Sequence, residues 1–531
     1  MIVGAGSAGC VLAARLTEDP ATRVLLLEAG PPDRHPYISI PLGMGRMHDK
    51  AMFDWGYETE PEANLNNRRI EAMRGKVLGG SSSINVMAYT RGNRGDYDRW
   101  AQKGARGWSH AEVLPYFRRM ERSWRGTGNY GSEGPLPITK NNTDYLLHHE
   151  LMQAIENAGQ PVTEDIHAGD EEGASFVELT IDEKGRRAST YEAYLKPAMQ
   201  RPNLAVVTNA LTRKVLVEDG RATGVEYEVG GEVRTARAGE TILAGGTYNS
   251  PQLLMLSGIG PAEHLAERGV PVVHDLPGVG RNLAEHPRVP LEFAATGPVT
   301  FVNQLRFDRA ARAVAQWYLF GTGPFARQLN SANPMLRTDA RLAQPDIQLF
   351  SNPVKLSAHL WFPGFVKSPE HAFSADVILL HPQARGWVGL KSPDPRDLPA
   401  IRLNLFDNEA DFVTARAGLR LARRIYATEP MAGLIARESV PGAEVQSDAD
   451  IDAHIRATAG TTQHPVGTCA IGPVVDPELR VHGIAGLRVV DASVMPDVPG
   501  GNTNGPTIMI AEKASDIIRG RSLPAIEKEA A

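Results

Sequence analysis

Three glycines near the start of the chain constrain its fold more than any other feature. Gly4, Gly6 and Gly9 follow a short apolar run and open a helical pattern. Glycines at this spacing permit a tight turn, a close approach of backbone to a pyrophosphate, and close packing of the helix on the strand. Glu28 ends the next apolar run, where a carboxylate accepts hydrogen bonds from the ribose hydroxyls of an adenosine. The pattern predicts a Rossmann-like dinucleotide-binding unit and does not separate FAD from NAD.

The size and charge of the chain narrow the class of protein. At 531 residues the chain exceeds one hydrophobic core, so two or more domains are expected. A net charge of -6 gives no basic surface for nucleic acid. No apolar run is long enough to span a membrane, and no export signal is recognisable. Two cysteines, Cys10 and Cys469, exclude a disulfide framework and fit a reducing compartment. We therefore expect a cytoplasmic protein without a transmembrane segment.

The apolar runs along the chain predict a mixture of strands and helices. The first run holds only Ile2 and Val3, fewer than the roughly five residues of a typical buried strand. This indicates a shortened beginning of the chain, which weakens the glycine turn locally without changing its identity. Further strands are expected at 23–27, 204–207, 215–217 and 241–244, a hairpin at 224–237, and helices near 146–158 and at 411–426.

A second polar cluster lies near the other end of the chain. His464 precedes an apolar run that ends in Asp491, and a tight loop with Asn502 and Asn504 follows. Ligands of open α/β sheets lie at the carboxyl ends of the strands, where Asp491 is expected. A neutral imidazole can take a proton from a hydroxyl group, and a side-chain amide can donate to the same oxygen. Beside a dinucleotide these groups indicate hydride chemistry, although Asn502 could equally satisfy its own turn.

Two glycine-rich segments offer further ligand contacts. In residues 74–85, consecutive glycines let the backbone approach a flat or anionic ligand, and serines supply donors. Residues 245–260 predict a strand end, a helix that starts at Ser-Pro, and a glycine that ends it. Taken alone, residues 74–85 are more typical of a structural Gly/Ser turn than of a ligand contact, and residues 245–260 are equally typical of scaffold.

These two segments resemble the signature regions of the glucose–methanol–choline (GMC) oxidoreductases, and within them the choline and medium-chain alcohol dehydrogenases. Further matches lie at residues 54–61, 277–283, 464–468 and 490–496, in the family's order along the whole chain. The resemblance implies FAD rather than NAD. It also implies an α/β Rossmann-like FAD-binding domain, assembled from discontinuous segments, and an α+β substrate domain with an antiparallel sheet.

The domain boundaries follow from the order of these matches. FAD-binding segments are expected at 1–155 and 201–290, a substrate-domain excursion at 156–200, the substrate-binding domain at 291–460, and a C-terminal return with the catalytic residues at 461–531.

The resemblance assigns roles to individual residues. His464 and Asn504 resemble the active-site pair: the imidazole would take the hydroxyl proton of an alcohol, the amide would hold its oxygen, and a hydride would pass to the flavin. The expected FAD-binding residues are Gly4, Gly6, Ser7, Ala8, Gly9, Glu28, Ala29, Gly79, Ser82, Asn85, Val86, Val215, Asp491, Ala492, Asn502 and Thr503. No metal is expected, since His359, His371 and His381 lack a metal-ligand spacing. The implied reaction is oxidation of a primary alcohol to an aldehyde.

Several alternatives stay open. The electron acceptor is either oxygen or a quinone-like molecule, and the sequence does not separate an oxidase from a dehydrogenase. Some relatives cleave cyanohydrins as hydroxynitrile lyases or decarboxylate fatty acids in light. A flavin-binding protein without turnover is a further alternative.

Two departures from the family pattern carry expectations. Ile84 stands where some choline oxidases have a histidine bonded to the flavin, so non-covalent FAD is expected. Residues 330–335 lack the carboxylate found in many relatives, and a quaternary ammonium is usually bound by a carboxylate or an aromatic cage. Choline is therefore less expected than a neutral alcohol, and Trp361, Phe362 and Phe365 are expected to pack beside a pocket.

Two other residues receive structural interpretations. His286 is expected to be a structural histidine near the flavin domain rather than a base. Cys469 is expected to be a small buried residue rather than a redox thiol.

Overall fold

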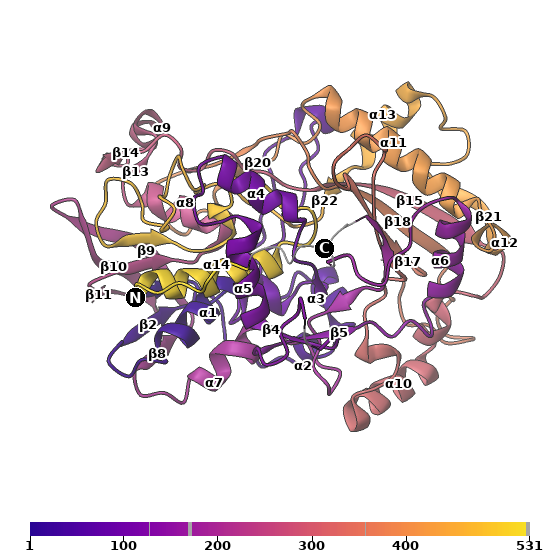
Figure 1. Ribbon diagram of the computed structural model, residues 1–531, viewed down its shortest axis with the longest axis horizontal. Coiled ribbons are helices and arrows are strands. Elements are labelled where there is room, and N and C mark those ends of the chain that lie inside the picture. The colour runs from indigo at the N-terminus through magenta and orange to yellow at the C-terminus, as the bar shows by residue number, and fades with distance from the viewer. Residues whose placement is uncertain (127, 168–171, 356, 527–531) are drawn as a thin grey trace.

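The strands of the protein gather in two main sheets (Figure 1). The computed structural model describes residues 1–126, 128–167, 172–355 and 357–526. One sheet is parallel and carries helices of the α/β type, and the other is antiparallel, so the predicted fold class is confirmed.

The parallel sheet draws its strands from the whole length of the chain. In the order β23-β12-β1-β2-β8 they are Leu487–Val489, Thr241–Leu243, Ile2–Val3, Val24–Leu27 and Leu204–Val207. The first strand is short, as expected, yet it is central: Ile2 pairs with Ile242 on one side and with Leu26 on the other. Its position explains why two residues suffice, since neighbours on both sides satisfy the backbone.

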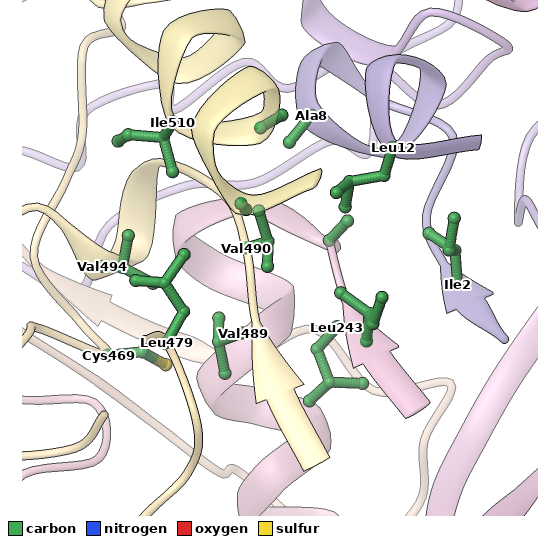
Figure 2. Close-up of a cluster of buried hydrophobic side chains, with 14 of the residues drawn as sticks. Ile2, Ala8, Leu12, Leu243, Cys469, Leu479, Val489, Val490, Val494 and Ile510 are labelled. Atoms are coloured by element: carbon green, nitrogen blue, oxygen red, sulfur yellow. The ribbon is translucent and has the colours of Figure 1, made fainter. Parts of the chain in front are cut away.

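Helices cover this sheet and bury its apolar side chains. They are α1 (Ser7–Leu16), α8 (Gly246–Leu256) and α14 (Asn504–Ile518). Figure 2 shows Leu12 of α1 and Ile510 of α14 above Leu243 and Val489 of the sheet. All four side chains are buried, so the two ends of the chain share one core.

A three-stranded antiparallel sheet projects beside the parallel one (Figure 1). It consists of β9 (Ala210–Glu218), β10 (Arg221–Val229) and β11 (Glu232–Arg237), which lengthen the predicted strand and hairpin.

The second main sheet has the order β21-β15-β18-β17-β16-β6, with β22 also paired to β15. These strands are Ile435–Val440, Pro287–Ala295, Ala372–Leu379, Ile347–Asn352, Asn333–Leu336, Gly173–Ser175 and Gly460–Thr461. Burial alternates along β15, where Val289, Leu291 and Phe293 point into the core, as the two-residue period of a strand requires.

Helix α11 (Glu409–Tyr426) packs on this antiparallel sheet. The Asn408 side chain caps it by accepting from the backbone N–H of Asp411 at 3.0 Å. A Cβ placed on Gly418 would lie 2.6 Å from Cγ1 of Val377 in β18, so a glycine is needed where the helix crosses the sheet.

The remaining α-helices and strands lie between these elements along the chain. The helices are α2 (Pro36–Ser39), α3 (Gly43–Asp49), α4 (Arg94–Gln102), α5 (His110–Met120), α6 (His148–Asn157), α7 (Lys196–Ala198), α9 (Ala262–Glu267), α10 (Phe307–Phe320), α12 (Met431–Leu434) and α13 (Asp448–Thr458). The strands are β3 (Ala88–Tyr89), β4 (Glu121–Ser123), β5 (Leu136–Lys140), β7 (Glu178–Leu179), β13 (Ile259–Gly260), β14 (His274–Asp275), β19 (Trp387–Gly389) and β20 (Ala400–Arg402). Within the described residues, none of the helices combines the length and apolarity needed to cross a bilayer.

Candidate active site

A cavity opens at the carboxyl end of the parallel sheet. Its walls include Val3 of β1 and Leu27 of β2, together with Ala244 after β12 and Asp491 after β23. Open α/β sheets bind ligands in this position. Of the predicted site residues, the cavity is lined by Gly4, Gly6, Ser7, Ala8, Glu28, Ala29, Asn85, Val86, His464, Asp491, Ala492, Asn502, Thr503 and Asn504. The fold therefore brings most of the predicted set together.

The glycine turn leaves no room for larger residues. Gly4 has a φ of +98°, a conformation that side chains disfavour. A Cβ on Gly9 would lie 1.8 Å from the carbonyl oxygen of Gly4, so α1 packs directly on the turn. A Cβ on Gly80 would lie 2.6 Å from Cα of Gly6, which shows that the segment 74–85 passes directly against the glycine turn.

Glu28 is held by the backbone on both sides. Its two carboxylate oxygens accept from the N–H groups of Ala5 and Gly30, each at 2.8 Å. Burial, opposed by these two hydrogen bonds, raises the pKa of Glu28 to about 7. The carboxyl group lines the cavity, and further lone pairs on its oxygens are available to ribose hydroxyls.

Two helix N-termini meet at the cavity. Helix α1 begins at Ser7 and α14 begins at Asn504, and Oγ of Ser7 donates to Oδ1 of Asn504 at 2.8 Å. The first N–H groups of a helix are unpaired and carry partial positive charge, so paired N-termini suit a diphosphate.

Asp491 joins the end of β23 to the start of α8. Its Oδ2 accepts from the N–H of Gly246 at 2.9 Å and from Oγ of Ser250 at 2.6 Å, while Oδ1 accepts from the N–H of Ser493 at 2.8 Å. Burial raises its pKa, and the three donors oppose that shift. Asp491 therefore shapes the cavity wall on which it lies.

Four predicted cofactor residues do not line the cavity: Gly9, Gly79, Ser82 and Val215. Oγ of Ser82 donates to the carbonyl of Gly79 at 2.6 Å, a hydrogen bond that lies within the glycine-rich turn itself. The N–H of Val215 donates to Oγ of Ser257 at 2.8 Å, so this residue joins β9 to the end of α8. The part of β9 that lines the cavity is its beginning, at Ala210, Leu211 and Thr212.

His464 lies in the cavity wall, and both nitrogens of its ring are within hydrogen-bonding distance of neighbouring side chains. Its Nδ1 is 3.1 Å from Nδ1 of His286 and 3.0 Å from Oγ1 of Thr462. Its Nε2 is 3.2 Å from Nδ2 of Asn502, and its backbone N–H donates to Oε1 of Glu285 at 2.8 Å. Four neighbours thus fix the position and rotation of one imidazole.

The partners also assign the tautomers. Nε2 of His286 lies 3.1 Å from the carbonyl of Leu380, which only accepts, so this nitrogen carries the proton. Burial, with His381 nearby, lowers the pKa of His286 to about 3, so the ring is neutral and its Nδ1 accepts from Nδ1–H of His464. Burial holds the pKa of His464 well below 6.5, and the neighbouring His286 and Arg74 lower it further. The lone pair of His464 therefore lies on Nε2, facing the Asn502 amide.

The two asparagines of the C-terminal loop make different contacts in the structure. Asn502, predicted only as a cofactor residue, is the asparagine whose amide reaches His464. Asn504 is the first residue of α14, and its side chain turns back to Ser7 on α1. The start of the helix between the two asparagines, which sequence spacing did not reveal, separates their directions.

Glu285 was missed by the sequence analysis, and Arg74 was included only as the first residue of the segment 74–85. Glu285 is buried, accepts the N–H groups of His464 and His286 on Oε1, and has no partner for Oε2 among the described residues. Burial raises its pKa to about 7. Arg74 lines the cavity and donates to the carbonyl of Gln463 at 2.5 Å. The only signal was position, since Glu285 adjoins the matched segment 277–283.

The aromatic residues expected beside a pocket lie elsewhere. Phe365 is 86% exposed and Phe362 is 39% exposed, and neither lines the cavity. Their loop closes on itself, with the N–H of Val366 donating to the carbonyl of Phe362 at 3.0 Å, so the rings project outward. Cys469 is fully buried, as expected.

The cavity fits FAD by its construction. The glycine turn, the paired helix N-termini and Glu28 suit the adenosine diphosphate half. Ile84 and Asn85, at the end of the segment 74–85, line a further part of the wall. Oδ1 of Asn502 is buried without a partner among the described residues, so a polar acceptor faces the cavity for a ligand donor.

Comparison with known proteins agrees with this construction. Family models described as GMC oxidoreductase match residues 1–288 and 382–511. The chain is 43% identical over 530 residues to the oxygen-dependent choline dehydrogenase of Brucella anthropi, covering 98% of this chain and 95% of that protein. It is 42% identical over 536 residues to the mitochondrial choline dehydrogenase of Homo sapiens, covering 98% and 89%.

Solved structures give the same result. The pyridoxine 4-oxidase of Mesorbium loti superposes with a TM-score of 0.87 at 31% identity, covering 98% of this chain and 99% of that one. A formate oxidase variant of Aspergillus oryzae, studied for FAD modification, superposes with a TM-score of 0.90 at 28% identity, covering 98% and 97%. The chain therefore belongs to the GMC oxidoreductase family and is an FAD-dependent oxidoreductase that acts on CH–OH donors.

Proposed function

We propose that the protein oxidises a neutral primary alcohol to an aldehyde, with His464 as the general base and Asn502 as its amide partner. The observation that carries this proposal is Nε2 of His464, which holds the lone pair of the ring and lies in the cavity wall 3.2 Å from Nδ2 of Asn502. This arrangement replaces Asn504 by Asn502 in the active-site pair.

Each group has a defined task in this proposal. Nε2 of His464 takes the hydroxyl proton of the alcohol while the Asn502 amide donates to the same oxygen. When bound, FAD supplies the hydride acceptor. The charge that develops on His464 lies beside the buried carboxyl group of Glu285, whose backbone contacts hold the ring in place.

Non-covalent attachment of FAD belongs to the same proposal. Ile84 lines the cavity where some relatives carry a flavin-bonded histidine, and an alkyl side chain forms no bond to the ring. Precipitation with acid should therefore release the yellow colour into the supernatant. Colour retained in the washed pellet would contradict this part of the proposal.

A neutral substrate is favoured by a positive charge that already lies beside the aromatic part of the cavity wall. Trp55, Tyr57 and Tyr248 form an aromatic wall, with Trp55 and Tyr57 stacked at 5.8 Å. The ammonium of Lys76 already lies 4.4 Å from the centre of the Trp55 ring. A second cation on this wall would be repelled, and among the described residues 330–335 no carboxylate compensates it.

Choline is the second candidate substrate, because relatives at 43% and 42% identity are named choline dehydrogenases. The electron acceptor is proposed as oxygen or a quinone-like molecule.

The experiment mixes the purified holoprotein with benzyl alcohol, 1-hexanol or choline without oxygen and follows flavin absorbance. Bleaching by a neutral alcohol supports the proposal, and admission of air then separates an oxidase from a dehydrogenase. Bleaching by choline alone would replace the neutral alcohol. Turnover of a cyanohydrin without bleaching would instead indicate a lyase.

The role of His464 has its own test. His464→Ala should slow anaerobic flavin reduction by about a hundredfold or more, because a general base contributes on that order. His359→Ala is the matched control, since His359 is exposed outside the cavity. Near-parental reduction by the His464 variant would remove His464 from the base position.

A further inference from the structure

Arg187 is a buried cation that binds the end of the segment 74–85. The residue is 2% exposed, and it does not line the cavity. Its Nε donates to the carbonyl of Ile38 at 2.9 Å. Its Nη1 donates to the carbonyl of Ser82 at 3.2 Å and to the carbonyl of Asn85 at 2.7 Å. One guanidinium therefore holds the backbone of a segment that forms part of the cavity wall.

The charge of Arg187 is not neutralised by an ion pair. Within the described residues no carboxylate pairs with it, and its Nη2 has no hydrogen-bond partner. Burial lowers the pKa of Arg187 to about 9, and Asp33 opposes that shift, so the guanidinium is charged at neutral pH. Burying a charge without a counter-ion is costly, so a specific role is expected for this side chain.

The guanidinium also fixes the side chain of Asn85. Oδ1 of Asn85 accepts from Nη1 of Arg187 at 2.8 Å and from the backbone N–H of Met87 at 3.0 Å. Both of these groups can only donate, so the oxygen of the amide lies toward them and the nitrogen lies on the other side. Across the part of the chain that the structure describes, Nδ2 of Asn85 has no partner. Its two N–H groups are therefore free for a ligand, and Asn85 lines the cavity.

The turn from Asn85 to Met87 has a conformation that needs support. Met87 has a φ of +61°, in the left-handed region that side chains disfavour. Such a conformation persists only where the surrounding contacts hold it. These contacts are the bond from the N–H of Met87 to Asn85 and the bond from the N–H of Thr180 to the carbonyl of Met87 at 2.9 Å. Because Arg187 binds the same oxygen of Asn85, it stabilises this turn as well.

Arg187 is itself held by its backbone. Its N–H donates to the carbonyl of Ser39 at 3.0 Å, and it forms an antiparallel bridge with Ile181. The N–H of Asp182 donates to the carbonyl of Arg186 at 2.8 Å, which closes a short hairpin. The guanidinium is therefore a fixed support for Asn85.

We propose that Arg187 is a positioning residue for FAD, which turns the amide of Asn85 so that its N–H groups donate to the bound cofactor. Arg187 does not line the cavity, so it acts through the segment that it holds. Hydrogen bonds in a chain polarise one another, so a charged donor on Oδ1 makes the N–H groups of Asn85 better donors. The proposal does not rest on the alcohol substrate or on the role of His464.

A double-mutant cycle on FAD affinity tests the proposal. Serial dilution of each holoprotein, with the fluorescence of released FAD, measures the dissociation constant. Asn85→Ala removes the N–H donors and should raise this constant about fivefold to tenfold, as the loss of a hydrogen bond predicts. Arg187→Met should raise it by a similar factor, because the amide of Asn85 is no longer held. The double variant should bind FAD about as weakly as Asn85→Ala alone, since coupled residues give non-additive effects. Multiplied effects in the double variant would overturn the proposal, because Arg187 would then act independently of Asn85.

Asn85→Asp separates the direction of the amide from folding. The aspartate keeps an oxygen for Arg187 and for the N–H of Met87, and it gives Arg187 a counter-ion, but it removes both N–H donors. The variant should keep the circular-dichroism spectrum of the parent while its FAD dissociation constant rises about tenfold or more. A variant that binds FAD like the parent would overturn the proposal.

Arg186→Met is the matched control, because Arg186 is exposed on the same hairpin. It should bind FAD like the parent, and a loss equal to that of Arg187→Met would overturn the proposal in favour of general damage to the hairpin. Circular dichroism reports whether each variant is folded. Arg187→Lys keeps a buried donor for the carbonyl oxygens, and it takes the place of Arg187→Met in the cycle, with the same expected non-additivity, if the methionine variant is unfolded.

Discussion

The Nδ1 atoms of His464 and His286 lie 3.1 Å apart, and this contact decides which nitrogen of His464 faces the cavity. The carbonyl of Leu380 holds the proton of His286 on Nε2, so His286 can only accept from His464. His286 does not line the cavity, yet it sets the tautomer of a residue that does. It acts as a positioning residue in the proposed mechanism.

Replacing His286 should slow catalysis without removing it. His286→Ala deletes the acceptor for Nδ1–H of His464, and one hydrogen bond of this kind contributes about 1 kcal/mol, so anaerobic flavin reduction should slow by up to about tenfold. Nitrogen-15 NMR of the imidazoles should show a mixture of His464 tautomers. A single unchanged His464 tautomer in the variant would contradict the positioning role.

The pH dependence of flavin reduction should follow the lowered pKa of His464. Burial holds this pKa well below 6.5, so the neutral base persists as the pH falls through 6.5 and the acid limb lies lower. The same lowered pKa affects stability. Below pH 6.5 the imidazole is protonated in the unfolded chain but stays neutral in the folded protein, so the free energy of unfolding falls as the pH falls. Rapid mixing with alcohol at stepped pH values measures the limb. A midpoint at 6.5 or above would refute the prediction.

The two asparagines should separate by phenotype. Asn502→Ala removes the donor to the substrate oxygen and should slow flavin reduction by tenfold to a hundredfold with FAD content preserved. Asn504→Ala removes the acceptor of the Ser7 hydroxyl at the paired helix ends and should lower FAD affinity instead. Stopped-flow reduction and FAD titration of the apoprotein distinguish them. Exchanged phenotypes would restore Asn504 to the active-site pair.

Gly80→Ala should disrupt the contact between the segment 74–85 and the glycine turn at Gly4–Gly9. The new Cβ would lie 2.6 Å from Cα of Gly6 at a φ of +54°. A side chain in this conformation and contact should cost at least about 2 kcal/mol of unfolding free energy and reduce FAD content. Gly45→Ala is the control, because no atom lies within 4 Å of its Cβ. Urea unfolding with FAD quantification measures both, and equal stability of the two variants would argue against this contact.

The fold was largely predictable because its signals are local. The spacing of Gly4, Gly6 and Gly9 and the acid Glu28 are contained in one strand–helix–strand unit, and the structure has that unit. The central position of β1 was not predictable, since pairing of Ile2 with Ile242 joins segments far apart in sequence. A strand two residues long offers no periodic pattern from which to infer such a partner.

The site was predictable as a set of residues but not as a set of contacts. His464 and both asparagines line one cavity, yet which amide reaches the histidine depends on where α14 begins. His286 was interpreted as a structural histidine, and its contact with His464 arises from tertiary packing of β15 against the C-terminal loop. Glu285 gave no motif of its own, because its role rests on backbone N–H groups that any residue supplies.

The parallel sheet has a consequence for the newly made protein. Its edge strand β23 pairs with β12 at Thr241 and Leu487, and the loop with Asn502 follows directly. A ribosome therefore releases the last strand of this sheet and the active-site loop nearly together, after the other four strands of the sheet have emerged. Until then the nascent chain has neither the completed parallel sheet nor the contact of His464 with Asn502, so the sheet and the active site are completed at the same stage of synthesis.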